Sequence, residues 1–146
     1  MKRIAAAAVV LFSSLGALAQ MTPVGLWKTI DDDGKTEKSL VRITEKDGVL
    51  TGAIEKIFDP AKQDAKCDKC TDDRKDKPVL GLVIIRNVRQ DADDKALWSG
   101  GDILDPHEGK VYKVRLHPIE GGKRQEVRGY IGVPLLGRTQ VWQRIE

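Results

Sequence analysis

The sequence predicts an all-β protein, and specifically an eight-stranded antiparallel barrel, on three observations. Short apolar segments alternate with turn signals at regular intervals. No stretch of about eleven residues shows a helical period. The third observation is a set of residues suited to joining the first and last strands, with a tryptophan plugging one end and an arginine stacked across it: Gly25, Trp27, Arg138, Trp142 and Arg144. Strand alternation places both arginines on the face of Trp142, so the sequence does not decide which one stacks.

The first residues have the pattern of a signal peptide. Lys2 and Arg3 precede an apolar run, and Ala17-Leu18-Ala19 fits a cleavage site. We therefore expect residues 1–19 to be removed and residues 20–146 to form a single β-barrel domain in a periplasmic or secreted protein. The run is shorter than the about 20 residues that span a bilayer, so no stable membrane anchor is expected.

Charge gives no indication of a nucleic-acid partner. The chain has 25 basic and 22 acidic residues, and without Lys2 and Arg3 the basic count falls to 23. No basic stripe interleaved with aromatic residues remains, so we expect no binding to nucleic acid.

The first half contains three predicted strands and then a segment of different character. The strands are 24–30, a segment around Val41 and Ile43, and 49–58, and Asp47-Gly48 is a strong hairpin signal. Twelve of the nineteen residues from 59 to 77 are charged, which predicts a solvated loop with one helical turn. The segment 78–85 is apolar without alternation, so a strand there is buried on both faces. Either the charged loop or a second copy in a homodimer through Val79–Ile85 then covers its outside.

The second half contains four further predicted strands, 96–104, 111–119, 125–131 and 138–145. The apolar residues of the loop 133–137 are expected to cap one end of the barrel. Alternation along the strands selects inward apolar residues, and an eight-stranded barrel either fills itself with these or holds one small ligand. The predicted ligand-lining residues are Val41, Ile43, Leu50, Ile54, Ile103, Val114, Leu116, Val127 and Ile131. Gly52 is expected to bend its strand and widen the space beside Ile54.

Several motifs resemble those of one family of exported bacterial proteins, the Domain of Unknown Function 2147 family. They lie at 98–106, 109–112, 128–132 and 136–142, and further matches occur at 25–29, at the cysteine pair and at 78–82. The resemblance covers essentially the whole chain after the signal peptide. It implies a lipocalin-like, calycin-type barrel, and it carries no catalytic residues to transfer.

Cys67 and Cys70, spaced as Cys-Asp-Lys-Cys, admit three interpretations. An exported chain favours a disulfide that staples the charged loop. A redox centre needs a strand–helix setting that lowers a thiol pKa, whereas this pair lies in a polar loop. A zinc site needs two more ligands, and the nine residues between His107 and His117 do not fit the usual spacing.

The acidic clusters are weak candidates for chemistry. The segment 31–34 fails the calcium-loop pattern, because Leu40 falls where the bidentate glutamate belongs. Asp102, Asp105 and Glu108, with His107 and Lys110, have the composition for acid–base work, but Asp105-Pro106 favours a turn. We therefore expect no catalytic residues, no metal site and no cofactor.

The sequence thus favours an exported small-molecule binding protein that holds an apolar ligand in its barrel. The alternative is a structural or interaction module of the cell envelope with a filled barrel, and an enzyme ranks third. A hollow or a packed interior distinguishes the first two hypotheses.

Overall fold

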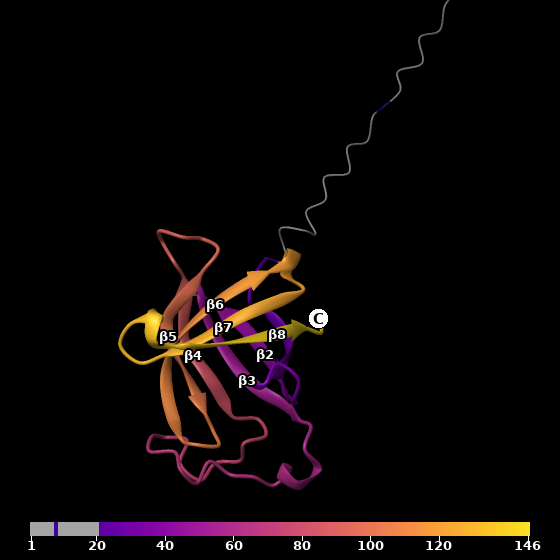
Figure 1. The fold of residues 1–146 in the computed structure, drawn as a ribbon, viewed down its shortest axis with the longest axis vertical. Coiled ribbons are helices and arrows are strands. Elements are labelled where there is room, and N and C mark those ends of the chain that lie inside the picture. The colour runs from indigo at the N-terminus through magenta and orange to yellow at the C-terminus, as the bar shows by residue number, and fades with distance from the viewer. Residues whose placement is uncertain (1–7, 9–20) are drawn as a thin grey trace, which may run out of the picture.

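The computed structural model describes Ala8 and residues 21–146, and these form a closed antiparallel barrel of eight strands (Figure 1). Apart from Ala8, the expected signal peptide and its cleavage site lie outside the described residues. The strands follow each other around the barrel in chain order, which confirms the predicted fold class. They are β1 Gly25–Ile30, β2 Glu37–Lys46, β3 Val49–Ile57, β4 Val83–Gln90, β5 Trp98–Asp105, β6 Lys110–Ile119, β7 Arg124–Tyr130 and β8 Arg138–Arg144.

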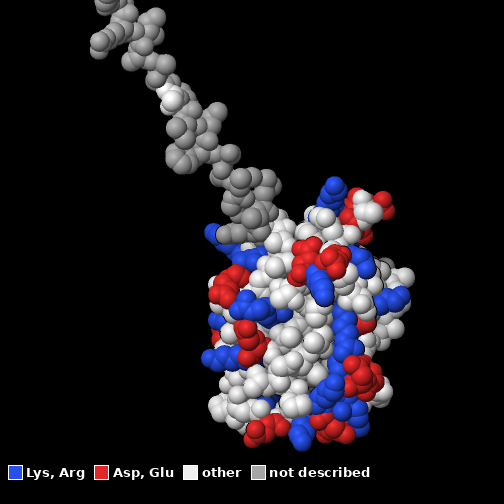
Figure 2. Space-filling model, turned by 180° about the vertical axis from the view of Figure 1, so that it is seen from behind, with Lys and Arg blue, Asp and Glu red and all other residues white. Residues whose placement is uncertain are grey.

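Three short 3-10 turns interrupt the connections: η1 Pro60–Lys62, η2 Glu120–Gly122 and η3 Pro134–Leu136. The predicted hairpin between β2 and β3 is confirmed, because Asp47 and Gly48 both adopt positive φ, as a two-residue type I′ turn requires. Among the described residues, no helix has the length and apolar character to cross a membrane. On the face shown in Figure 2, positive and negative side chains are intermingled, with uncharged surface between them.

One half of the barrel interior is packed solid. Trp27 lies at the end of this half, fully buried, and its indole Nε1 donates a 2.8 Å hydrogen bond to the Pro23 carbonyl. Aliphatic side chains from β2, β3, β4 and β6 fill the space around it and exclude solvent: Val41, Ile43, Leu50, Ile85, Val88, Val114 and Leu116. Burial of this apolar surface supplies the main stabilisation of the barrel.

The seam between β1 and β8 is short. Backbone pairing joins Trp27 with Arg144 and Lys28 with Gln143, and Leu26 exchanges backbone hydrogen bonds with Ile145 and Glu146 just after β8. Beyond this point side chains join the two strands: Gln140 Nε2 donates a 2.9 Å bond to Asp32 Oδ1, and Arg138 forms a 2.6 Å ion pair with Asp32 Oδ2. This seam is therefore held by backbone hydrogen bonds at the packed end of the barrel and by side chains at the other end.

The charged loop between β3 and β4 covers the outer face of β4 and β5. Ile85 and Ile103 oppose each other inside the barrel, so alternation turns their neighbours Ile84 and Leu104 outward, yet both are buried. They share one apolar cluster with Cys67 and Cys70 of the loop. This loop, magenta to pink in Figure 1, runs beneath the barrel. The loop of the same chain thus buries the outer face of β4, while the barrel interior buries its inner face.

Charged side chains hold the same loop in place. Arg74 is buried, donates a 2.9 Å hydrogen bond to the Val83 carbonyl and binds Asp72 at 2.6 Å. Arg86 of β4 forms a 2.9 Å ion pair with Asp73. The prediction of a solvated loop is correct for most of its charges and for its turn η1, but wrong for Arg74 and both cysteines.

Two predicted elements differ from the structure. The strand expected at 78–85 is β4 at 83–90, because residues 79–82 form the return of the loop and hydrogen-bond to Ile54. Asn87 has positive φ, which interrupts the alternation of inward and outward side chains in β4. The second half of this strand therefore lacks the sequence pattern by which a strand is predicted. The loop 133–137 caps no end of the barrel, since its leucines point into solvent.

A cavity at the open end as candidate functional site

A cavity of about 800 Å³ opens at the end of the barrel opposite Trp27 and extends along the loop between β3 and β4. It is bounded by the strand ends, by the turns that follow β1 and β5, and by the loop between β3 and β4. Its inner wall is apolar and comes from four different strands: Ile54, Ile103, Val127 and Trp142. Apolar walls with a few polar groups are typical of small-molecule sites in proteins.

One side of the cavity carries ordered polar groups. The hydroxyls of Thr29 and Ser39 lie 2.8 Å apart, and Trp142 Nε1 donates a 3.0 Å hydrogen bond to Gln140 Oε1. Because Gln140 also donates to Asp32, a chain of hydrogen bonds runs from the apolar wall to the rim. These residues provide hydroxyl and amide groups within reach of a bound molecule.

The rim carries charged groups of both signs. Lys62, Lys66 and Lys69 border the cavity, and none has an ion-pair partner among the described residues. By contrast, Asp59 caps the backbone N–H of Ala61, and Asp105 Oδ1 accepts from the backbone of the turn that follows it. Asp68 also borders the cavity without an ion-pair partner among the described residues, so the mouth presents ammonium and carboxylate groups together.

The nine predicted lining residues divide into three groups. Ile54, Ile103 and Val127 line the cavity. Ile131 lies just beyond β7 and is exposed, so it does not point inward, because the strand ends one residue earlier at Tyr130. The other five are buried in the packed half: Val41, Ile43, Leu50, Val114 and Leu116.

Gly52 does not widen the cavity as expected. A Cβ on Gly52 would lie 3.0 Å from the side chain of Ile85. The glycine therefore makes room for an isoleucine of the neighbouring strand, and that isoleucine fills the space.

The residues predicted to close the barrel lie at two different ends of it. The Arg144 guanidinium lies 4.3 Å from the centroid of the Trp27 ring and donates to the carbonyls of Thr22, Val24 and Gly122. Burial there lowers the pKa of Arg144 from its ordinary value. Arg138 and Trp142 lie at the other end, on the cavity. Gly25 lies beside Arg144. A Cβ on Gly25 would lie 2.5 Å from Arg144 Nη1 and would overlap the Glu146 carbonyl oxygen.

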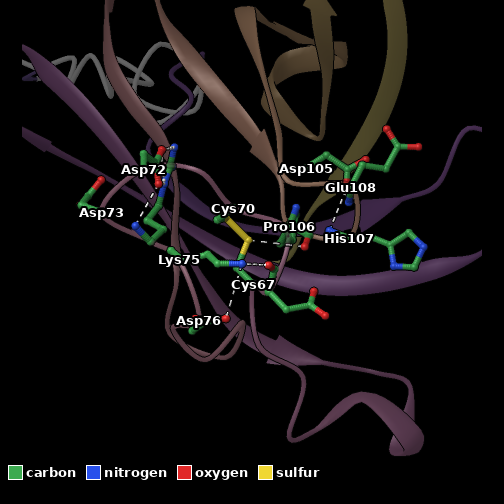
Figure 3. Close-up of a disulfide and its surroundings, with 12 residues drawn as sticks. Cys67, Cys70, Asp72, Asp73, Lys75, Asp76, Asp105, Pro106, His107 and Glu108 are labelled. Carbon is green, nitrogen blue, oxygen red and sulfur yellow. Dashed lines mark hydrogen bonds and ion pairs between the residues drawn. A yellow bond between two sulfur atoms is a disulfide. The ribbon is translucent and has the colours of Figure 1, made fainter.

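Cys67 and Cys70 form a disulfide with their Cα atoms 5.3 Å apart (Figure 3). Cys67 Sγ lies 3.6 Å from the Pro106 carbonyl oxygen in the turn between β5 and β6. Gly109 of that turn packs against the backbone of Lys69, where a Cβ would overlap the Lys69 carbonyl. The disulfide thus fastens the loop to this turn beside the cavity.

The polar cluster from Asp102 to Lys110 does not converge on a reaction centre. Asp105 caps its own turn, and His107 and Glu108 point away from the disulfide (Figure 3). Asp102 lies on the outer face, opposite Lys113 and Arg86. Within the described part of the chain, no three His, Cys, Asp or Glu side chains gather as a ligand set for a metal ion.

Electrostatic contacts also perturb carboxyl groups in the covering loop. Hydrogen bonds from Arg74 lower the pKa of Asp72 from 3.8 to about 2. Contact with Arg86 lowers the pKa of Asp73 as well. Both aspartates therefore stay ionised while they fix the loop to β4.

Sequence reasoning overlooked the polar residues of the cavity, namely Thr29, Ser39, Tyr112 and Gln140. A usable signal was present for two of them. Thr29 lies two positions after Trp27, and Gln140 two positions before Trp142, so each shares the inward face of its strand with a tryptophan.

Together, the closed eight-stranded barrel, its plugged end and its open cavity define a lipocalin-like protein. The chain belongs to the family described as an uncharacterized protein conserved in bacteria (DUF2147), whose family model matches residues 25–144. A solved structure described as "Protein HP1028 from the human pathogen Helicobacter pylori belongs to the lipocalin family" has a similar fold, with a TM-score of 0.72 and 20% identity. The similarity covers 86% of this chain and 84% of that one. No curated protein matches the chain.

Proposed function

We propose that the protein is an exported carrier of a small ligand, whose apolar part lies against Ile54, Ile103, Val127 and Trp142. The cavity carries this proposal: it opens at one end of the barrel, whereas the end at Trp27 is filled with side chains. An interior without a ligand would be expected to fill with side chains, as it does around Trp27. A site of about 800 Å³ falls in the range of drug-sized ligands.

The polar groups of the cavity specify further properties of such a ligand. The hydroxyl pair of Thr29 and Ser39 and the amide of Gln140 match a molecule with hydrogen-bonding groups near the mouth. Ammonium groups (Lys62, Lys66, Lys69) and carboxylates (Asp59, Asp68, Asp105) both border the mouth, which favours a polar outer end of the ligand. We therefore favour an amphipathic molecule with a polar outer end.

A fluorescent fatty acid is the probe for this proposal, and Ile54→Lys is the test variant. The new ammonium group would stand in the cavity and reach water through the mouth, so we expect a folded protein without probe binding. Ile43→Lys is the matched control, because Ile43 lies in the packed half, where a charge has no route to water. We expect this control to fail to fold.

The outcomes separate the carrier from the alternative module. Probe binding by the wild type, lost in a folded Ile54→Lys variant, supports the carrier. A wild type that binds no probe, and that carries no small molecule in native mass spectrometry after purification from its own host, overturns it. The envelope interaction module would then be the better hypothesis.

Export forms a separate part of the proposal. The pattern of residues 1–19 supports transport to the periplasm or beyond, with cleavage between Ala19 and Gln20. Mass analysis of the N-terminus of protein recovered outside the cytoplasm tests this expectation, and retention of residues 1–19 contradicts it.

A further inference from the structure

The loop between β7 and β8 exposes an unusual run of aliphatic side chains. The exposed fractions are 67% for Ile131, 54% for Val133, 86% for Leu135 and 75% for Leu136. The segment 131–137 contains no charged or aromatic residue. In Figure 1 its turn η3 is the yellow coil that projects from the left side of the barrel. Clustered apolar exposure of this kind marks an interaction site, whereas scattered exposed leucines do not.

The loop is held in one conformation. Arg128 Nε donates a 2.6 Å hydrogen bond to the Pro134 carbonyl, and the same guanidinium reaches the Leu135 carbonyl and the Thr139 hydroxyl. Gly137 closes against β7, where a Cβ would lie 2.8 Å from that of Tyr130. The apolar side chains are therefore presented on an ordered support rather than on a loop that folds back over them.

Positive charge lies directly beside this apolar tip. Arg115 of β6 and Arg128 of β7 oppose each other across the outer face of the sheet. Neither forms an ion pair with a carboxylate of the described residues. Like charges placed opposite each other destabilise a sheet, and an external anion relieves this repulsion. The surface thus joins an aliphatic tip to two arginines that have no carboxylate partner among the described residues.

We propose that this surface, formed by the tip 131–136 and by Arg115 and Arg128, docks onto a lipid bilayer that contains anionic lipids. The aliphatic side chains would enter the acyl boundary while the arginines meet lipid phosphates. Because Gly129 and Arg138 flank the loop and also line the cavity, docking places the cavity mouth beside the lipid surface. The proposal does not depend on a ligand occupying the cavity.

A second copy of the chain fits this surface less well. A stable interface takes about 800 Å² from each partner, and a tip of four side chains falls short of that area. In a symmetric dimer through the loop, the same arginines would also approach one another across the two-fold axis. Lipid phosphates remove this repulsion, whereas a second copy increases it.

Co-sedimentation with vesicles tests the proposal, using phosphatidylcholine alone and a phosphatidylcholine–phosphatidylglycerol mixture. We expect wild-type protein to bind the mixed vesicles, to bind them less at high salt, and to bind neutral vesicles weakly. Replacing both leucines (Leu135→Ser with Leu136→Ser) should weaken binding to the mixed vesicles by about tenfold or more. Leu80→Ser is the matched control, because Leu80 is 44% exposed on another part of the surface and should bind as wild type.

The charge contribution has its own pair of variants. Arg115→Gln should weaken binding to mixed vesicles by about fivefold and leave binding to neutral vesicles unchanged. Lys46→Gln, at the far end of β2, should change neither. A wild type that pellets with neither vesicle overturns the proposal, as does a double leucine variant that binds like wild type. Concentration-dependent association without lipid, abolished by Leu135→Ser, would assign the surface to a protein partner instead.

Discussion

Arg144 lies across the face of Trp27 at 4.3 Å and, at the same time, donates to three backbone carbonyls around it. One side chain thus covers the aromatic plug and ties the segment before β1 to η2. Because these hydrogen bonds are charge-assisted and partly sheltered, each is worth more than an exposed contact. Closure of this end therefore depends on the pair as a unit.

We expect Arg144→Ala to destabilise the protein by about 3 kcal/mol, since it removes a sheltered cation–π contact and several charged hydrogen bonds. Arg138→Ala is the control from the same strand. Its side chain is 70% exposed and its ion pair with Asp32 is at the surface, so a loss below about 1 kcal/mol is expected. Urea denaturation measures both. Equal losses would contradict the assignment of Arg144 as the closing arginine.

Trp27→Ala should be the most damaging substitution in β1. Loss of a fully buried tryptophan costs about 3–5 kcal/mol. Leu26→Ala, on the other face of the strand, should cost less, at about 2–3 kcal/mol. Thermal unfolding followed by circular dichroism compares the two variants. A clearly less stable Leu26→Ala variant would mean that the plug is not the main support of this strand.

The disulfide should stabilise the covering loop without being required for the barrel. Replacing both cysteines by alanine should cost about 2 kcal/mol, because the cross-link closes only a very short loop. Circular dichroism should still report the barrel, while residues 59–82 become sensitive to protease. Failure of the double variant to form the barrel would contradict this expectation.

Gly109→Ala should release the same loop by a different route. The new Cβ would overlap the Lys69 carbonyl, whereas a Cβ on Gly121, at a similar φ, would meet nothing. Gly121→Ala therefore carries only the backbone strain of about 1–2 kcal/mol and serves as the control. Limited proteolysis should show cleavage within 59–82 for Gly109→Ala alone. Similar cleavage of both variants would mean that the turn does not hold the loop.

The loop should also respond to strong acid. The pKa of Asp72 is about 2 in the folded protein and 3.8 ordinarily, so its contribution to stability is complete above pH 3.8 and declines as the pH falls toward 2. Asp72→Asn should lower stability at neutral pH and flatten the pH dependence in that window. Stability measured in denaturant from pH 5 to about pH 2 tests this. An unchanged slope in the variant would assign the acid sensitivity to other carboxyl groups.

Local patterns were sufficient to predict the number and type of strands. The turn signals between segments and the alternation within Val41–Ile43 or Val111–Ile119 are properties of consecutive residues, so they survive in the sequence. The cysteine pair is equally local. In each case the relevant neighbour is only a few residues away.

Long-range stagger could not be predicted in the same way. Arg138 and Arg144 have the same parity, and only the pairing of β8 with β1 places Arg144 opposite Trp27. The same is true of the predicted lining residues. Whether an inward residue such as Ile54 faces the cavity, or one such as Ile43 lies in packed core, depends on its height in the barrel. No local pattern records that height. The register of β4 against β3 shifts between Ile85 and Val88, where Asn87 has positive φ, and this irregularity concealed the second half of β4.

The division of the β1–β8 seam separates two properties of the molecule. Backbone pairing at Trp27 and Lys28 supports the stability of the barrel, whereas Asp32, Arg138 and Gln140 border the cavity and join the strands by side chains alone. Under the proposed carrier function, substitutions among these three residues would change which molecules enter the cavity without removing a backbone pair of the sheet. The proposed selectivity and the stability of the barrel therefore depend on different positions, so one can be altered by substitution while the other is retained.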